Sequence, residues 1–402
     1  MKLRNWLLVI PWLLLLGVWS LSNALDLPVT TSVTSSTGGP TQFQSNIGGM
    51  SLGWIKVGSK EVATLAWHPD FKFGAWGLGA DVNLALGDNK PAGYETAVLR
   101  YVEYDDLKKG LRYGILDGVT LGRGLIMKNY STRVGNMVLP VNEQTGLKGY
   151  VDLDQNIIRA MGTRSNIYYL RLEQRINPNL TIGEHYVTDT TGRKIVQTDG
   201  TTRQFPAVSA IGVDAVMPLP ANFEGYAEAG QLMNHGNGYA AGLSWGYDMM
   251  VANASFLAEY RMLDKGFVPS YFSVDYENNP VDLASAEASG KPKNGYYAQL
   301  GVNALGLASV SFIYEAYQDS NASLTGDLTA KFTDQLTVRG YYKQPNFVDY
   351  RSITLEQGAI MGADVAYKVN PYTSLITHYK KSYNPTTGQV ESTQYYEVGL
   401  SF

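Results

Sequence analysis

Apolar and polar residues alternate along most of the chain from about Gly49 to Phe402. In Ala322–Phe332, every second residue is apolar, alanine or glycine, and the residues between them are Ser, Thr, Asp or Lys. Val251–Arg261 and Gly358–Val369 repeat this alternation. A period of two places the two sets of side chains on opposite faces of a strand. Since no long stretch after the amino terminus has a helical period, the pattern predicts an all-β protein.

The charged residues of these segments lie almost wholly on one face, and the other face consists mainly of Ala, Val, Leu and aromatic residues. A charge that faces lipid at the middle of a bilayer costs about 2–4 kcal/mol, which explains such segregation in a membrane-spanning sheet. A water-soluble sandwich would alternate too, but its strands would usually be shorter. The pattern therefore favours a transmembrane sheet, which must close into a barrel because lipid cannot satisfy free backbone groups.

Short connections such as Asn370-Pro371 alternate with long ones such as 189–205 and 261–293. This rhythm is typical of antiparallel barrels with short periplasmic turns and longer external loops. Counting strands from both ends predicts about 18 of them, within a range of roughly 16–20, and an even number puts both ends on the periplasmic side. The last strand, ending at Phe402, then pairs with the first, near Gly49–Val57.

The chain ends in an alternating strand, Tyr395–Phe402, whose apolar face is Tyr396, Val398, Leu400 and Phe402. A last strand of this kind with a terminal Phe resembles the final strand of bacterial outer-membrane β-barrels, which the barrel-assembly machinery reads as a membrane-insertion signal. The stretch Tyr113–Tyr130 is similar to one in uncharacterised barrels of diderm bacteria. The resemblance implies a porin-like barrel in the outer membrane, surrounded by lipid and lipopolysaccharide. It leaves a homotrimer open as the assembled form.

The stretch 118–164 begins and ends at predicted external strand ends, and it is long for a simple loop. Its apolar clusters, such as Leu125-Ile126-Met127 and Ile157-Ile158, need burial. A barrel of about 18 strands has a lumen wide enough to hold such a segment. We therefore expect 118–164 to fold inward and to narrow the pore. Alternatively, 119–127 and 146–153 are a further pair of strands, which raises the count to about 20.

Charged residues of this stretch and of the strands around it are candidates for lining the pore, because charges in a confined passage bias its selectivity. The carboxylates Glu224 and Glu228 share one face of Phe223–Gly230 and are expected to face the stretch. An alternative role for the arginines is to pair with wall carboxylates and brace the lumen. The candidates are Arg123, Lys128, Arg133, Arg159, Arg164, Glu224, Glu228 and Arg339.

The amino terminus has the three-part layout of a secretory signal peptide. Met1–Arg4 carries two positive charges, Trp6–Trp19 is mostly apolar, and Ser22-Asn23-Ala24 is a small-x-small cleavage site. The apolar part is shorter than the roughly 20 residues that a spanning helix needs. We expect cleavage after residue 24 and export by the Sec route. Residues 25–46 are then a flexible periplasmic lead-in, and 47–402 form the barrel.

Composition excludes several classes of function. The chain has a net charge of −4 and no cysteine, so it has neither a basic footprint for nucleic acid nor a disulfide framework. Its 28 Tyr and 42 Gly suit interfacial aromatic girdles and curved sheets. The four histidines show no metal-cluster spacing, and no serine-elbow motif is present. His185 near Asp189 is the one pairing of a catalytic type. We therefore expect no enzyme activity, metal or cofactor.

These features predict a porin-like channel through which small hydrophilic solutes or ions diffuse passively. One alternative is a substrate-specific transporter or receptor barrel. Another is a structural or adhesive barrel, because long external stretches such as 261–293 present tyrosines and carboxylates. Ion conductance would separate the channel from the structural barrel, and current block by a solute would separate a specific channel from a general one.

Overall fold

The structure is a computed structural model of the 402-residue chain. The described residues all belong to one unit, Val33–Phe402. The predicted signal peptide and lead-in, Arg133 and Phe402 lie outside the described residues. The structure describes residues 49–57, 60–86, 96–132, 144–196, 201–249, 251–277, 279–304, 307–348, 359–370, 373–384 and 389–400.

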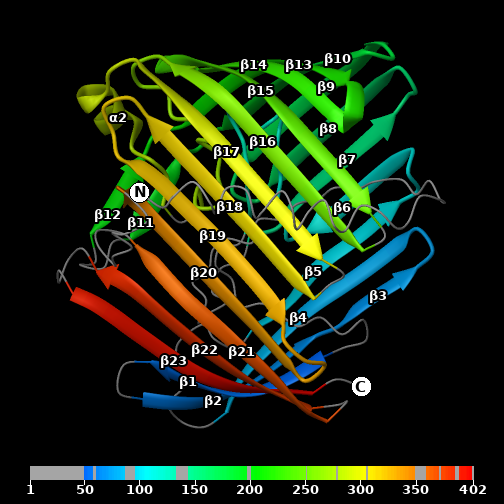
Figure 1. The fold of residues 1–402 in the computed structure, drawn as a ribbon, viewed down its shortest axis with the longest axis vertical. Coiled ribbons are helices and arrows are strands. Elements are labelled where there is room, and N and C mark those ends of the chain that lie inside the picture. The colour runs from blue at the N-terminus through cyan, green and yellow to red at the C-terminus, as the bar shows by residue number, and fades with distance from the viewer. Residues whose placement is uncertain are drawn as a thin grey trace, which may run out of the picture. The chain divides into compact units, whose positions relative to one another are not determined.

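The described part of the chain is an all-β protein in which 21 strands form one antiparallel sheet, and β11 and β12 form a separate two-stranded sheet (Figure 1). One short helix, α2 (Leu283–Ser289), and one 3-10 turn, η1 (Pro220–Asn222), lie between strands. The strands are β1 (Gly49–Val57), β2 (Lys60–His68), β3 (Asp70–Phe73), β4 (Trp76–Leu86), β5 (Thr96–Asp105), β6 (Lys109–Gly114), β7 (Gly146–Asp152), β8 (Asn156–Thr163), β9 (Ile167–Asn177), β10 (Leu180–Asp189), β11 (Arg193–Val196), β12 (Thr202–Phe205), β13 (Val208–Leu219), β14 (Phe223–Leu232), β15 (Gly236–Met249), β16 (Ala252–Leu263), β17 (Lys293–Ala304), β18 (Ala308–Tyr317), β19 (Ala322–Lys331), β20 (Leu336–Phe347), β21 (Ile360–Asn370), β22 (Thr373–Asn384) and β23 (Gln389–Leu400).

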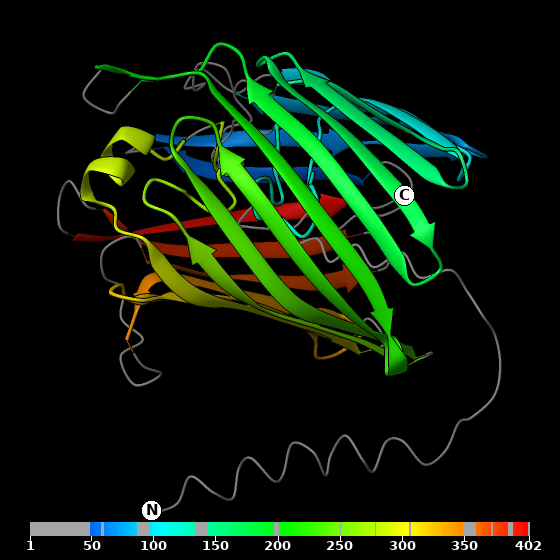
Figure 2. The same ribbon diagram turned by 90° about the horizontal axis from the view of Figure 1, so that it is seen from above.

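Strands that follow one another in the chain pair with one another, with two exceptions. β2 and β3 do not pair with each other, and β10 pairs with β13 across the β11–β12 hairpin. β2 and β3 flank Pro69 and both pair with β4, so they act as one interrupted strand. Proline has no N–H to give to a ladder, which accounts for the interruption. β1 pairs with β2 on one side and with β23 on the other, where Met50 lies opposite Leu400 and Trp54 opposite Tyr396. In Figure 2 the strands follow the chain order around the sheet, and the last ones lie beside the first.

The described residues contain more strands than the central figure of about 18, but their number lies within the predicted range of roughly 16–20. Counting β2 and β3 as one, the sheet has 20 strands, because β7 and β8 form a further pair within the stretch 118–164. The alternative interpretation placed this pair at 119–127 and 146–153. The range 146–153 matches β7, whereas 119–127 is not a strand of the sheet. Leu147 and Val151 point to the exposed face of the sheet, and Lys148 lies between them on the other face. This alternation makes 146–163 part of the wall rather than of an inward segment.

The connections differ between the two ends of the sheet. At one end they are tight turns, such as 106–108 after β5, 153–155 after β7 and 178–179 after β9. At the other end, 115–145 and 264–292 join strands through long excursions. The predicted rhythm of short turns and long loops is thus present in the described chain. The long excursions carry the residues of the candidate site.

One face of the sheet exposes large apolar side chains and the other buries charged ones, which is the reverse of the arrangement in a soluble protein. On β17 and β18, Leu300, Val302, Phe312 and Tyr314 are 39–46% exposed. On the opposite face, charged side chains such as Arg261 are buried, at 1% exposure. The face that carries the buried charges is called the inner face below. Burying charge while exposing large apolar side chains is costly in water, so the environment of the outer face is expected to be apolar.

Among the described residues, no helix has both the length and the apolar character needed to cross a membrane. The helix α2 lies in the long connection between β16 and β17, where the carboxylate of Asp282 caps it by accepting a hydrogen bond from the N–H of Ala284 at 3.1 Å.

Candidate functional site

The chain leaves the sheet at the end of β6 and crosses the inner face as Ile115–Thr132, here called the inner segment. Gly114 makes the bend with a φ of 130°. A Cβ at Gly114 would lie 2.3 Å from the carbonyl oxygen of Arg100. The N–H of Ile115 donates to that same carbonyl at 2.7 Å. Only glycine allows the segment to turn off the wall this closely.

The inner segment folds back on itself as a narrow hairpin. The N–H groups of Val119 and Tyr130 donate to each other's carbonyl oxygens at 3.0 and 2.9 Å. At its tip, Gly122 and Gly124 have φ values of 57° and 98°, in the region that glycine adopts without steric cost. The Gly-Arg-Gly sequence therefore forms a tight turn that presents Arg123.

The long connection between β16 and β17, residues 264–292, is called the inner loop because it lies along the inner segment. The N–H of Ser270 donates to Leu125 O at 2.7 Å, and the N–H of Phe272 donates to Ile126 O at 3.1 Å. In return, the N–H of Lys128 donates to Phe272 O at 3.1 Å. The inner segment and the inner loop therefore share a short backbone ladder and form one body.

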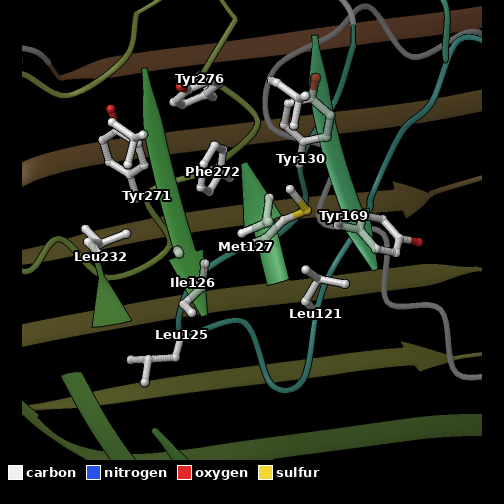
Figure 3. Packing of buried hydrophobic residues seen from close by; sticks show 14 of the residues in the cluster. Leu121, Leu125, Ile126, Met127, Tyr130, Tyr169, Leu232, Tyr271, Phe272 and Tyr276 are labelled. Atoms are coloured by element: carbon white, nitrogen blue, oxygen red, sulfur yellow. The ribbon is translucent and has the colours of Figure 1, made fainter. Parts of the chain in front are cut away.

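This body has its own apolar core, and Figure 3 shows Phe272 surrounded by Tyr271, Tyr276 and Met127. Phe272 and Met127 have no exposed surface. Strands β8 to β10 and β13 to β16 supply the wall side of the core. The members from the inner segment are Leu116, Val119, Leu121, Leu125, Ile126, Met127 and Tyr130, and those from the inner loop are Phe267, Tyr271, Phe272, Tyr276 and Leu283.

Ile126 lies on two glycines of the wall. Gly212 of β13 and Gly230 of β14 are directly opposite each other in the ladder. A Cβ at Gly212 would come within 2.9 Å of Ile126 Cδ1, and a Cβ at Gly230 within 2.8 Å of Ile126 Cγ1. A Cβ at Gly212 would first meet His185 Nε2 at 2.4 Å, so it is at Gly230 that a larger residue would chiefly displace Ile126.

Carboxylates of β14 hold the tip of the inner segment. Glu228 is 3% exposed, and its Oε2 accepts the N–H of Arg123 at 3.1 Å and the N–H of Leu125 at 3.3 Å. The guanidinium of Arg123 donates to Glu224 Oε2 at 2.5 Å and lies 5.2 Å from the ring centre of Tyr226. One strand thus binds both the backbone and the side chain of the turn.

Lys128 fixes the segment to β17. Its Nζ donates to the hydroxyl of Tyr297 at 2.7 Å and lies 3.9 Å from the centre of the same ring. Arg261 lies 4.2 Å from that ring centre. Burial, followed by the positive charge of Arg261, lowers the pKa of Lys128 from 10.5 to about 8. The amine is therefore mostly protonated at neutral pH and loses its proton at mildly alkaline pH.

A buried polar network ties the inner segment and the inner loop to Asp189, the last residue of β10. The hydroxyl of Tyr130 donates to Glu277, which also accepts from Arg193 Nη1 at 3.0 Å. Arg193 Nε donates to Asp189 Oδ2 at 2.8 Å, and so does the hydroxyl of Tyr276, also at 2.8 Å. Each carboxylate is satisfied from two sides, which is what makes a buried charged group tolerable.

A cavity of about 470 Å³ remains between residues 118–122 of the inner segment and the wall formed by β5 to β9. In contrast to the apolar core, charged side chains dominate its lining, and Tyr150 and Tyr169 add aromatic surface. A volume of this size suits a small solute, since ligand pockets span roughly 300–1,000 Å³. The charged lining residues used below are Glu103, Asp105, Arg112, Lys148, Arg159, Arg171 and Glu173.

No protein-family model and no curated protein matches the sequence. Several solved structures resemble the chain. A BenF-like porin from Pseudomonas fluorescens Pf-5 is 9% identical, with 89% of this chain and 98% of that chain covered and a TM-score of 0.42. The outer membrane protein opdK from Pseudomonas aeruginosa is 8% identical, with 88% and 97% covered and a TM-score of 0.38. Pseudomonas aeruginosa OccK2 (OpdF), solved in complex with glucuronate, is 12% identical, with 88% and 94% covered and a TM-score of 0.38. No residue role carries over from these proteins.

The structure brings four of the predicted site residues together. Arg123 and Lys128 lie on the inner segment and meet Glu224, Glu228 and Tyr297 on the wall. Arg123 pairs with the wall carboxylate Glu224, which is the kind of contact that the alternative, bracing role of the arginines requires.

The other predicted residues lie elsewhere. Arg159 lines the cavity from β8 and donates to Glu173 at 2.9 Å. Arg164 is exposed in the turn between β8 and β9. Arg339 of β20 is 2% exposed and pairs with Asp327 at 2.7 Å, within the wall. In the last strand, Tyr396 is 49% exposed on the outer face.

Sequence reasoning missed most of the cavity wall. Arg112, Arg171 and Glu173 occupy alternate positions of β6 and β9 and face inward. The alternation of polar and apolar residues in β6 and β9 already placed these three charged side chains on the polar face of their strands. The mistaken inward placement of 146–163 removed β7 and β8 from the predicted wall, so the strands that frame the cavity were not recognised as neighbours.

The pairing of His185 with Asp189 does not form. His185 Nδ1 lies 3.1 Å from Arg171 Nη1, whereas Asp189 is taken up by Arg193 and Tyr276. Within the described residues, no group of His, Cys, Asp and Glu is arranged to hold a metal ion.

Proposed function

We propose that the chain is a closed transmembrane β-barrel of the bacterial outer membrane, through which small hydrophilic solutes or ions diffuse passively. In this proposal the inner segment and the inner loop form a constriction inside the lumen. The pairing of β1 with β23 supports closure, because it leaves neither strand as a free edge. The observation that carries the proposal is the charged cavity beside a firmly held inner segment.

The reversed faces of the sheet support a membrane environment. Burying apolar surface is worth roughly 25 cal/mol per Å², so side chains such as Leu300 and Phe312 would be unfavourable in water and are favourable against lipid tails. The paired charges of the inner face would in turn meet an aqueous passage, which is the usual arrangement in channel-forming barrels.

The inner segment and the inner loop divide the inner face into an apolar region and a charged region. Against β8 to β10 and β13 to β16 they form a dry apolar core that excludes water and ions. Against β5 to β9 they leave the charged cavity. We therefore place the route of the solute along the cavity side, where Glu103, Arg112 and Lys148 replace part of a solute's hydration shell.

Replacing residues 118–129 by a short Gly-Ser linker tests the constriction. These residues supply most of the contacts by which the inner segment packs on the wall. Their removal should widen the passage and is expected to raise single-channel conductance severalfold in planar bilayers. The matched control exchanges the four external residues 318–321, between β18 and β19, for Gly and Ser, and is expected to conduct like the unchanged protein. Equal conductance of both variants would refute the constriction.

A substrate-specific channel is the second candidate, and the composition of the cavity favours it. Arg112 with Glu103 and Arg159 with Glu173 place charges of both signs around one volume. Such a site would hold a solute with matching groups rather than any small solute. Concentration-dependent block of the ion current by a panel of anionic, cationic and zwitterionic solutes separates this candidate from the general channel. A structural barrel would show no current.

Lys128 predicts a pH dependence of the constriction. An undocked Lys128 would have a pKa near 10.5, and the docked one has a pKa of about 8. Between these values the undocked state binds more protons, so docking becomes more favourable as pH rises. Fluctuations of the open-channel current are expected to decrease from pH 7 to pH 10. In Lys128→Met this decrease should be absent, and its persistence there would assign the effect to another group.

A further inference from the structure

The cations that line the cavity differ in whether a carboxylate neutralises them. Arg112 Nη1 donates to Glu103 at 2.7 Å. Arg159 Nε and Arg171 Nε both donate to the same oxygen of Glu173, each at 2.9 Å. Arg171 also binds Asp214 through two nitrogens, at 2.5 and 2.9 Å. The three arginines are therefore part of ion-pair networks in the wall.

Lys148 is the exception. It is half-buried on the inner face of β7 and lines the cavity, and in the part of the chain that the structure describes it has no ion pair and no side-chain hydrogen bond. Its partner across the ladder is Arg112, which is also a cation, and on the other side it lies opposite the uncharged Met161. The register of β7 thus leaves Lys148 without a carboxylate directly opposite it in the ladder.

The carboxylates that act electrostatically on Lys148 are Glu103 and Asp117, and neither forms an ion pair with it. Glu103 accepts from Arg112 at 2.7 Å, and the exposed Asp117 accepts from Ser131 Oγ at 2.5 Å. Asp105 also lines the cavity, but it is exposed at the end of β5 and accepts hydrogen bonds from Tyr150 and from the N–H of Leu107. Water screens a charge at this position more strongly than one held between the wall and the inner segment. Among the residues that line the cavity, four cations face three carboxylates, so the lining carries one excess positive charge.

We propose that Lys148 is the residue that makes the channel prefer anions, so that a small anionic solute or ion is the favoured cargo of the cavity. The proposal rests on the proposed channel function. A unit charge about 6 Å from a permeating ion, even at the dielectric constant of water, changes the ion's free energy by roughly 0.7 kcal/mol, which corresponds to about threefold in the permeability of that ion. Lower dielectric in the constriction increases this effect.

Reversal potentials of the refolded full chain in a KCl gradient test the proposal. The unchanged protein is expected to be anion-selective. Lys148→Gln should lose about tenfold in the chloride-to-potassium permeability ratio, because the charge favours chloride about threefold and disfavours potassium about threefold. Lys148→Glu should lose more. Lys148→Arg should keep the selectivity. The matched control is Lys109→Gln, which removes the same charge from an exposed lysine at the turn end of the neighbouring strand, outside the cavity. It should leave the reversal potential unchanged.

A chemical variant avoids any effect on folding. The chain has no cysteine, so Lys148→Cys is the single thiol and can be modified after insertion into the bilayer. A cationic methanethiosulfonate should restore the anion preference in the open channel, and an anionic one should reverse it.

The outcomes distinguish the two proposals. Conductance with an unchanged reversal potential in Lys148→Glu and in both modified forms would overturn the role of Lys148 and leave the channel function standing. Absence of conductance in the unchanged protein would overturn the channel function itself, and the role of Lys148 with it.

Discussion

Ile126→Asp is expected to release the inner segment and to raise single-channel conductance toward that of the linker variant. Ile126 has no exposed surface and lies on the bare backbones of Gly212 and Gly230. Aspartate loses the apolar contacts of the isoleucine and places a carboxylate in the buried apolar core. The docked state should lose at least about 3 kcal/mol of stability. This loss lowers the equilibrium constant for docking by more than two orders of magnitude.

Two further variants separate docking from a general loss of stability. Ile126→Val removes one methylene and should conduct like the unchanged protein, because such a change costs about 0.5–1.5 kcal/mol. Gly230→Val leaves the sequence of the inner segment unchanged but places a side chain where Ile126 packs. It should raise the conductance as Ile126→Asp does. Heat resistance of the folded barrel in detergent should remain unchanged in all three. Normal conductance in both Ile126→Asp and Gly230→Val would show that the segment does not limit the current.

Glu228→Ala is the second change with a large expected effect. Glu228 Oε2 accepts the N–H groups of Arg123 and Leu125, so alanine leaves two backbone donors without their acceptor. Unsatisfied buried donors of this kind cost about 1–3 kcal/mol each. The turn at the tip of the inner segment should loosen, and recordings should show frequent transitions to higher conductance.

Glu228→Gln is the matched control, since its amide oxygen can accept both N–H groups. A Cβ at Gly122 would lie 2.6 Å from Glu228 Oε1 and 3.0 Å from Asp214 Oδ2, so these two carboxylate oxygens are close to each other. The amide nitrogen of glutamine would donate toward Asp214 and keep the side chain in place. Glu228→Gln should therefore conduct steadily. Equal behaviour of the alanine and glutamine variants would assign the effect to the lost charge rather than to the backbone hydrogen bonds.

The alternation of side chains was a reliable guide to most of the wall. Strands β9, β10 and β13 to β23 lie close to where the period of two predicts them, and short turns join them at one end. A period of two is a local property, because each residue's face depends only on its neighbours in the strand. Pairing of the last strand with the first followed from strand parity, and β23 does pair with β1.

The stretch 118–164 shows where local pattern is insufficient. Apolar residues occur both in the inner segment, as Leu125-Ile126-Met127, and in β8, as Ile157-Ile158. In the inner segment they are buried by the inner loop and by the wall. In β8, Ile158 is 41% exposed on the outer face. Composition alone cannot separate these two environments, since both reward apolar side chains.

The sequence by itself determined the all-β class, the two-faced strands and the need to bury part of 118–164, because these depend on residue types at short spacing. Only the tertiary structure shows which residues of this stretch pack against the wall and which lining cation has no ion pair. Gly212 and Gly230 form one surface on which Ile126 packs, because the register of β13 and β14 places them opposite each other. Likewise, Lys148 lacks a carboxylate partner only because the register of β6 and β7 sets it opposite Arg112. Register and docking are contacts between distant parts of the chain, and no local pattern encodes them.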